Sequence, residues 1–297
     1  TLLHGPRRRP PPPSAMAKTR SAAPPRPSAA ATSTAAATAR ISFRSRKIVK
    51  TPPSKPPAAA ALPPPAPPAP VLPALSAPGE LAAALRHLAA ADPLLSEVIA
   101  STDAPAFTST PSLPAFHSLA RSILYQQLAT SAAAAIYARF LALLPSAADG
   151  AVSPAAVLAL AAADLRAIGV SGRKAAYLHD LAARFAAGDL SESSVAAMGE
   201  DALLAQLTRV KGIGEWTVHM FMIFSLHRPD VLPSGDLGVR KGVQELYKLK
   251  ALPKPEEMAA LCERWRPYRS VGAWYMWRLL ESKGAAAKKA KKGNASS

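Results

Sequence analysis

The stretch "LTRVKGIGEWTVHMF" (207–221) places a short Gly-x-Gly turn between two apolar segments. This pattern predicts two helices joined by a tight turn at 210–214. Glycines permit positive φ and let another molecule approach the backbone closely. Because the second helix begins at about Glu215, its N-terminus and the turn amides form a candidate anion site. The alternative is a plain helical hairpin whose glycines only turn the chain.

The chain from residue 80 onward consists of amphipathic segments broken by Pro and Gly, without sustained alternation of apolar and polar residues. Such periodicity predicts an all-α domain over 80–282. The expected helices are 80–90, 93–100, 114–128, 130–143, 154–161, 163–168, 171–187, 192–197, 200–207, 215–226, 237–247, 255–265 and 270–281.

The formal net charge of +17 is concentrated at the two ends of the chain. Residues 1–79 contain twelve Lys or Arg and no acid, and 283–297 contain five Lys and no acid. The 19 basic residues of 80–282 balance its 19 acidic residues. A basic binding face within 80–282 must therefore come from how its charged residues are arranged on the surface and not from an excess of basic residues. The two ends supply a non-specific attraction to polyanions.

Both ends have the composition of disordered chain. We predict a disordered basic leader rich in Pro, Ala and Ser at 1–79 and a disordered Lys-rich tail at 283–297. The basic clusters "RSRKIVK" (44–50) and "KKAKK" (288–292) favour the nucleus. An Arg-rich, Ser-rich, acid-poor leader also suits import into a plastid or mitochondrion, so that alternative stays open. Met16 is a candidate translation start.

Several classes of protein are excluded by composition. No run of about 20 apolar residues occurs, so no membrane partner is expected. The single cysteine, Cys262, excludes a disulfide framework, a cysteine-ligated zinc site and a four-cysteine iron–sulfur cluster within this chain. Its setting in "MAALCERW" predicts a packing role. We expect no side-chain metal site and no required cofactor.

Asp236 is a candidate catalytic carboxylate. It lies in "HRPDVLPSGDLGVRKG" (227–242), 22 residues beyond Gly214 and at the expected start of a helix. Helix capping explains an Asp there equally well. A carboxylate that follows a phosphate-holding hairpin can also face the sugar, where it would stabilise the oxocarbenium-like charge formed when a glycosidic bond breaks.

Taken together, these motifs resemble the helix-hairpin-helix DNA glycosylases of base excision repair, in the DNA-3-methyladenine glycosylase II branch. The resemblance covers about 80–282 and implies a two-lobed, all-helical fold. It rests on the hairpin and aspartate motifs and on further segments in the same order. These are "HLAAADPLLSEVI" (87–99), "FHSLARSILYQQLATSAAAAIYARF" (116–140), "LRAIGVSGRKAAYLHDLA" (165–182) and "WRPYRSVGAWYMWRLLE" (265–281).

The resemblance assigns roles to positions of this chain. It makes Asp236 the catalytic residue. It makes the hairpin turn, Val210, Lys211, Gly212, Ile213 and Gly214, the segment that grips a DNA phosphate. A monovalent cation, Na or K, is expected at the backbone carbonyls of Val210 and Gly212. Trp216 takes the slot of the Schiff-base lysine of strand-nicking relatives, so base release without lyase activity is expected.

The resemblance also implies base flipping and gap filling. The segment "YQQL" (125–128) matches the part that enters the minor groove, with Gln126 in contact with DNA and Gln127 as the wedge; an interhelical Gln127 is the alternative. Trp216, Trp277 and Tyr125 match the walls of the base pocket. For eight other residues a binding role is an alternative to an ordinary structural role, and for Trp274 and Tyr275 packing in the core is the favoured interpretation. The eight are Trp274, Tyr275, His219, Arg269, Arg240, Lys241, Arg173 and Lys174.

The function implied is a monofunctional DNA glycosylase. It would hydrolyse the N-glycosidic bond of alkylated purines, of the 3-methyladenine and 7-methylguanine type, in duplex DNA, and would act as a monomer. One alternative is a glycosylase for uracil or oxidised guanine. The other is a non-catalytic DNA-binding module, which would need the hairpin but not Asp236.

Overall fold

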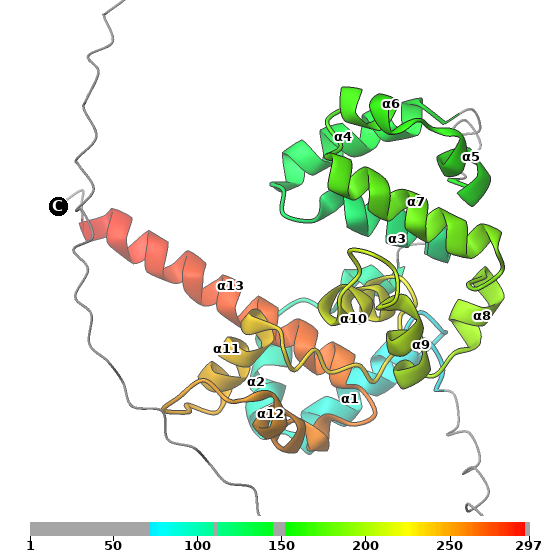
Figure 1. The fold of residues 1–297 in the computed structure, drawn as a ribbon. Coiled ribbons are helices and arrows are strands. Elements are labelled where there is room, and N and C mark those ends of the chain that lie inside the picture. The colour runs from blue at the N-terminus through cyan, green and yellow to red at the C-terminus, as the bar shows by residue number, and fades with distance from the viewer. Residues whose placement is uncertain (1–71, 110–111, 145–151, 295–297) are drawn as a thin grey trace, which may run out of the picture. The chain divides into compact units, whose positions relative to one another are not determined.

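The computed structural model describes residues 72–109, 112–144 and 152–294, all within the compact unit 66–297. Every regular element of these residues is a helix (Figure 1). The α-helices are α1 (Glu80–Ala91), α2 (Pro93–Ser101), α3 (Ala115–Tyr125), α4 (Thr130–Ala142), α5 (Pro154–Ala159), α6 (Ala162–Ala167), α7 (Gly172–Ala186), α8 (Glu192–Ala197), α9 (Glu200–Leu207), α10 (Glu215–Phe224), α11 (Leu237–Leu246), α12 (Pro255–Leu261) and α13 (Arg269–Asn294), with 3-10 turns η1 (Ala106–Ser109) and η3 (Glu263–Trp265). The prediction of an all-α fold is confirmed, and none of the described helices is long and apolar enough to cross a membrane.

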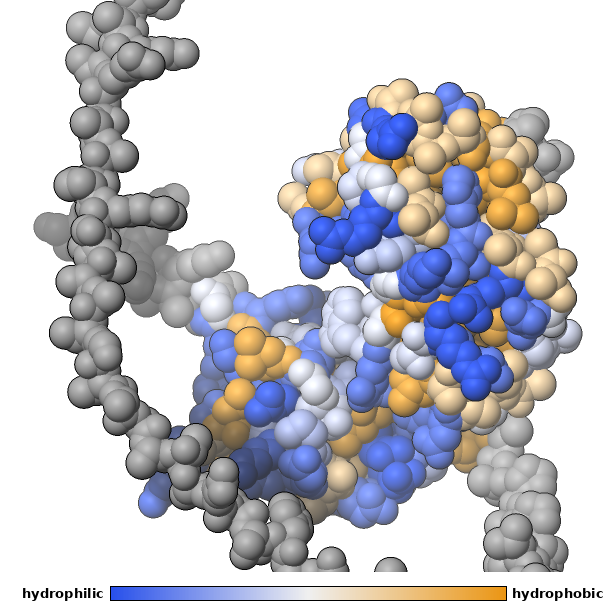
Figure 2. All heavy atoms as spheres, in the orientation of Figure 1, coloured by the Kyte–Doolittle hydropathy of each residue, from blue (hydrophilic) through white to orange (hydrophobic). Residues whose placement is uncertain are grey.

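Two hydrophobic clusters define two lobes. The first cluster is built mainly from α3 to α10, and the second from α1, α2 and α11 to α13. Phe107 and Trp277 pack against both clusters and so join the lobes. On the face shown in Figure 2, hydrophilic residues gather over α7 and the adjoining hairpin, and the surface is hollowed between the two lobes. The two-lobed architecture expected from the resemblance is present.

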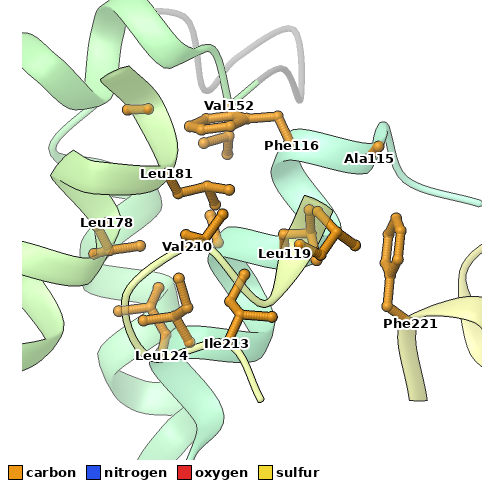
Figure 3. Packing of buried hydrophobic residues seen from close by; sticks show 14 of the residues in the cluster. Ala115, Phe116, Leu119, Leu124, Val152, Leu178, Leu181, Val210, Ile213 and Phe221 are labelled. Carbon is orange, nitrogen blue, oxygen red and sulfur yellow. The ribbon is translucent and has the colours of Figure 1, made fainter. Parts of the chain in front are cut away.

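The turn between α9 and α10 is anchored in the first cluster. Val210 and Ile213 are 1% and 4% exposed and point among the leucines of α3 and α7 (Figure 3). Burying an aliphatic side chain of this size stabilises a fold by about 1.5–3 kcal/mol. The apolar residues of the turn therefore fix its place on the lobe, and Lys211, Gly212 and Gly214 alternate with them.

Polar side chains cap the N-termini of several helices. The Ser171 side chain accepts a hydrogen bond from Lys174 N at the start of α7, and Ser153 and Ser191 cap α5 and α8. The start of α3 is capped from another helix, because the two carboxylate oxygens of Glu192 accept from Ala115 N and Phe116 N at 2.6 and 3.0 Å. These caps satisfy amides that a helix cannot satisfy itself.

Asp92 joins three elements of the second lobe. It is 1% exposed and caps α2 by accepting from Leu95 N, while its Oδ2 accepts from Tyr247 Oη at 2.5 Å and Trp265 Nε1 at 2.9 Å. Burial by itself raises the pKa of Asp92. The hydrogen bonds outweigh that effect and hold the pKa below its usual range.

Two predicted helix ends are wrong. The helix expected over 114–128 stops at Tyr125, because Gln126 leaves the helical region and Gln127 adopts φ 56°. The helix expected over 255–265 ends at Leu261 and is followed by η3. Neither break has a Gly or Pro to announce it.

The predicted domain limits also shift at both ends. Residues 72–79 belong to the fold, since Leu75 is 1% exposed and Leu75 N donates to His227 O at 2.8 Å. The rest of the leader predicted at 1–79, residues 1–71, lies outside the described residues. The prediction of a disordered tail is wrong for 283–294, because α13 continues to Asn294. Ala and Lys favour helix, and Lys283 forms an ion pair with Glu245 at the root of this extension.

Candidate active site

The hairpin turn, residues 210–214, presents backbone amides at the start of α10. Gly214 is the N-cap of α10 and no side chain caps that helix. The first N–H groups of α10 have no partner within the helix. Together with the positive end of the helix dipole, they suit a negatively charged group.

The two glycines of the turn have different roles. Gly212 has φ 80°, and a Cβ there would lie 2.1 Å from Cδ2 of Tyr177, so only glycine fits against α7. Gly214 has an ordinary φ of −102°, and a Cβ there would meet no atom of this chain within 4 Å. Packing therefore explains Gly212, while the open side of Gly214 leaves room for another molecule. From the sequence alone, both glycines are expected to let another molecule approach the backbone.

Asp180 of α7 holds the hairpin turn through a hydrogen bond and an ion pair with Lys211. Its Oδ2 accepts from Lys211 N at 3.0 Å, and the Lys211 ammonium lies 3.7 Å from Oδ1. Burial raises the pKa of Asp180, but the hydrogen bonds from Lys211 N and Arg184 and the nearby charges of these residues lower it below its usual value. The Lys211 side chain is 69% exposed, so it remains accessible to a phosphate.

Asp236 is held by three N–H donors. It caps α11, with Oδ1 accepting from Val239 N at 2.8 Å. The indole Nε1 of Trp277 donates to the same oxygen at 2.9 Å, and that of Trp216 donates to Oδ2 at 2.6 Å. Helix capping and the predicted catalytic place thus coexist, and the carboxylate is fixed in orientation at the start of a helix.

Both tryptophans predicted as pocket walls therefore contact the catalytic candidate. Trp216 comes from the first turn of α10, Trp277 from α13 and Asp236 from α11, so three helices meet at one carboxylate. Gly238 makes this contact possible, since a Cβ there would lie 2.8 Å from Cδ1 of Trp277 and 3.0 Å from Asp236 Oδ1. The "GDLG" spacing was a signal for this packing that sequence reasoning missed.

Phe224 is a further aromatic residue of the site that sequence reasoning missed. It is 39% exposed and stacks on Trp277 with ring centroids 5.8 Å apart. Trp216 is 54% exposed and lies eight residues earlier on the same helix, and Asp236 and Trp277 link its side chain to that of Phe224. Exposed large apolar side chains that gather at one place mark ligand or partner sites.

Tyr125 lies in a different setting from the two tryptophans. The guanidinium of Arg121 lies 4.5 Å above its ring, and Tyr137 meets it edge-on with centroids 6.0 Å apart. One face of Tyr125 is therefore already occupied by a cation. Of the other aromatics, Tyr275 is fully buried and Trp274 packs against it, so both belong to the core.

The segment after α3 touches the hairpin turn. Gln126 Nε2 donates to Gly212 O at 2.9 Å, and the next residue, Gln127, is exposed. A positive φ at a non-glycine residue such as Gln127 costs about 1 kcal/mol or more. Leu128 is 40% exposed beside it, although no role of its own within this segment is expected from the sequence. We call residues 126–129 the wedge loop.

Most of the remaining candidates have structural partners. Lys174 Nζ donates to Leu124 O and Gln126 O, and Arg240 Nε donates to Pro253 O. Arg269 is 8% exposed and forms an ion pair with Asp230. Burial of His219 lowers its pKa, which favours the neutral ring. Arg173 and Lys241 are exposed.

The expected cation at the hairpin remains a prediction. Val210 O accepts from Ile213 N and Gly212 O accepts from Gln126, yet a carbonyl oxygen keeps a second lone pair. Among the described residues, no group of three His, Cys, Asp or Glu side chains could hold a metal. Cys262 is buried, and burial raises the pKa of its thiol to about 12, in keeping with a packing role. A cavity of about 420 Å³ lies elsewhere, lined by Met198, Leu226 and Arg228 among others.

Comparison with known proteins points to one family. Residues 120–267 match the family model described as HhH-GPD superfamily base excision DNA repair protein. The chain is 31% identical over 169 residues to a putative DNA-3-methyladenine glycosylase of Bacillus subtilis, which covers 56% of this chain and 59% of that protein. It is 34% identical over 164 residues to DNA-3-methyladenine glycosylase 1 of Schizosaccharomyces pombe. This match covers 55% of this chain and 71% of that protein.

A solved structure agrees with these matches. The 3-methyladenine DNA glycosylase of Schizosaccharomyces pombe in complex with abasic DNA superposes with a TM-score of 0.57 at 30% sequence identity. The superposition covers 66% of this chain and 95% of that one. The shared part therefore contains nearly the whole of the yeast protein's fold.

Proposed function

Because the chain belongs to the HhH-GPD superfamily of base excision DNA repair proteins, in its DNA-3-methyladenine glycosylase branch, we propose that it hydrolyses the N-glycosidic bond of alkylated purines in duplex DNA. The observation that carries the proposal is the Asp236 carboxylate, which two indole N–H groups and a helix N-terminus hold beside the hairpin. A module that only bound DNA would not need a carboxylate oriented in this way.

The hairpin turn supplies the grip on the DNA backbone. The open amides at the start of α10 and the exposed ammonium of Lys211 suit a phosphate oxygen. Gly214 lets the sugar-phosphate chain approach without meeting a side chain. These contacts carry no sequence information, as a repair enzyme that must act at many sites requires.

The wedge loop fills the space that a flipped nucleotide leaves. We assign this task to Gln127 together with Leu128, because Leu128 places an exposed apolar side chain next to the predicted wedge. Apolar side chains inserted between base steps are a common device for unstacking DNA. The flipped base would then leave the stack toward the carboxylate.

Trp216, Phe224 and Trp277 form the walls that receive the base. A base alkylated at N3 or N7 carries positive charge, so an electron-rich ring attracts it with about 0.5–2 kcal/mol. Tyr125 is a weaker wall than the resemblance implied, because Arg121 already occupies one face of its ring. Such a pocket selects positively charged, planar bases and does not require one pattern of hydrogen bonds.

Asp236 acts when the glycosidic bond breaks. The departing alkylated purine takes the electron pair of the bond, which neutralises its own positive charge and leaves oxocarbenium-like charge on the sugar. The carboxylate stabilises that charge and orients a water molecule, whose oxygen forms the new bond to the anomeric carbon. The proton lost by that water passes to the carboxylate and then to solvent.

The reaction is expected to stop at the abasic site. The residue in the slot of the Schiff-base lysine is Trp216, whose N–H donates to Asp236. The Lys211 amine lies beside Asp180 instead. Borohydride should therefore trap no covalent adduct with lesion DNA, and a trapped adduct would contradict the monofunctional assignment.

Defined duplexes test the choice of lesion. We expect single-turnover release of 7-methylguanine and 3-methyladenine from 25-mers with one lesion, and none from matched duplexes with uracil or 8-oxoguanine. Release of uracil or 8-oxoguanine alone would favour the other lesion class. Tight duplex binding without release of any base would favour the non-catalytic module.

We propose that the protein acts as a monomer in the nucleus. The basic clusters 44–50 and 288–292 support import into the nucleus. Fluorescent fusions with either cluster changed to Gln test this location, and accumulation in plastids or mitochondria would contradict it. Sedimentation of the free protein and of its DNA complex tests the monomer.

A further inference from the structure

The two segments proposed to touch DNA are far apart in sequence but directly linked in space. The wedge loop follows α3 and the hairpin turn follows α9, yet Gln126 Nε2 donates to Gly212 O at 2.9 Å. This hydrogen bond joins residues 86 positions apart. The wedge loop and the hairpin turn can therefore act as one rigid unit if both are attached to the same helix.

The wedge loop is attached to α7 through Lys174. Its Nζ donates to Leu124 O at 2.7 Å and to Gln126 O at 2.8 Å. These carbonyls lie at the C-terminal end of α3, where the helix leaves carbonyl groups unsatisfied and a cation is favourable. Lys174 thus closes the end of α3 at the point where the chain turns into Gln127.

The hairpin turn is attached to the same helix. Tyr177 lies so close to Gly212 that no Cβ fits between them. Asp180 Oδ2 accepts from Lys211 N at 3.0 Å, and Arg184 NH2 donates to Arg209 O at 2.8 Å. An ion pair at 3.2 Å joins Asp180 and Arg184 and fixes both.

These four residues lie on one side of α7. Lys174, Tyr177, Asp180 and Arg184 follow one another at steps of three, three and four residues, which places them in a single stripe along the helix. We call them the α7 stripe. Its first residue holds the wedge loop, Tyr177 and Asp180 hold the hairpin turn, and Arg184 holds Arg209 directly before that turn.

We propose that the α7 stripe fixes the position of the wedge loop relative to the hairpin turn, which we call their register. Lys174 is the positioning residue of the wedge loop. The inference rests on the function proposed above. A phosphate held by the hairpin then fixes where Gln127 and Leu128 enter the stack, and hence which nucleotide leaves it. Lys174 acts through the α3 carbonyls and does not itself contact DNA.

Lys174→Met tests this role, because methionine fills similar space but donates no hydrogen bond. One readout is the fluorescence of 2-aminopurine placed beside an abasic-site analogue, which rises when the wedge unstacks that step and needs no catalysis. The other readouts are the Kd for undamaged duplex and the single-turnover rate of 7-methylguanine release. Arg166→Met, which removes a charge from the exposed surface of α6, is the matched control.

We expect Lys174→Met to reduce the fluorescence change and the release rate at least tenfold, with less than a threefold change in Kd for undamaged duplex. Lys174→Arg should recover most of both signals, since it keeps donors for the α3 carbonyls. Gln126→Ala removes the link to Gly212 and leaves the Gln126 carbonyl that Lys174 contacts, so it should lower the fluorescence change by a smaller factor. Arg166→Met should leave both signals at the wild-type level.

A different pattern would overturn the inference. If Lys174→Met weakens duplex binding and flattens its salt dependence while fluorescence and rate at saturation stay unchanged, Lys174 is a phosphate contact. If Lys174→Met does not fold, Gln126→Ala carries the test, and a fluorescence change equal to that of the wild type in this variant would contradict the register role. If the wild type shows the fluorescence change but releases no base, the proposed chemistry fails and the positioning role stands.

Discussion

Replacing Asp236 with Asn removes one charge from the site and leaves its shape nearly intact. If the amide oxygen takes the place of Oδ1, it still accepts from Val239 N and Trp277 Nε1. The amide NH2 then faces the N–H of Trp216, which now donates to Oδ2 at 2.6 Å. Two donors cannot pair, so one hydrogen bond is lost.

The loss of stability from this change should be small. Trp216 is 54% exposed and can turn toward water, so we take the low end of the 1–3 kcal/mol that an unpaired buried donor costs, about 1 kcal/mol. For a domain of this size that corresponds to a shift in Tm of about 2–4 °C. Thermal unfolding monitored by circular dichroism at 222 nm measures it.

The effect on rate should be much larger. A unit charge about 4 Å from the developing positive charge contributes about 4 kcal/mol at an effective dielectric constant of 20, which is about a thousandfold in rate. Single-turnover release of 7-methylguanine, with enzyme well above Kd, measures this separately from binding. Asp164→Asn, an equal change of charge at an exposed residue of α6, is the control. A rate within tenfold of wild type for Asp236→Asn would refute the charge-stabilisation argument.

Three further predictions concern the stability of the fold and its titratable groups. Gly212→Ala should destabilise the protein by about 3 kcal/mol or more, because the new Cβ would lie 2.1 Å from Cδ2 of Tyr177 and φ is 80°. The matched Gly214→Ala should weaken duplex binding and cost about 1 kcal/mol or less, because Ala is a poorer N-cap than Gly but meets no atom of this chain; equal Tm losses for both would contradict this distinction. The lowered pKa of Asp92 means that its ionised form contributes stability above the unfolded pKa near 3.9, and that this contribution is lost as pH falls through the folded pKa; acid unfolding curves should therefore be shallower for Asp92→Asn. Cys262 should resist iodoacetamide in the native protein and react after unfolding, since burial raises its pKa to about 12, and rapid native modification seen by intact mass would show that the thiol is accessible.

Local signals in the sequence were enough to place most helices. Ser171 and Ser191 cap their helices, and Pro93, Pro154 and Pro255 lie in the first turns of others, as the patterns of helix starts indicate. The end of α3 could not be found in this way, because the chain leaves the helix at two glutamines. What ends the helix there is tertiary, a lysine from α7 and a carbonyl from the hairpin turn.

The site was predictable in its parts but not in its connections. Asp236 and the hairpin follow from motifs within one continuous stretch of sequence. The contacts of Asp236 with Trp216 and Trp277 join residues 20 and 41 positions apart, which no local pattern reveals. The same holds for Lys174, because a lysine exposed at a helix start and a half-buried lysine that donates to two carbonyls look alike in sequence.

The products released from methylated DNA show whether this chain breaks the glycosidic bond of alkylated purines. Duplex DNA treated with a methylating agent would be incubated with the full chain, and the soluble products resolved by chromatography against authentic bases. We expect free 3-methyladenine and 7-methylguanine, with the DNA strands left uncut until alkali is added. Methylated DNA that is bound but yields no free base above the no-enzyme control would contradict this expectation.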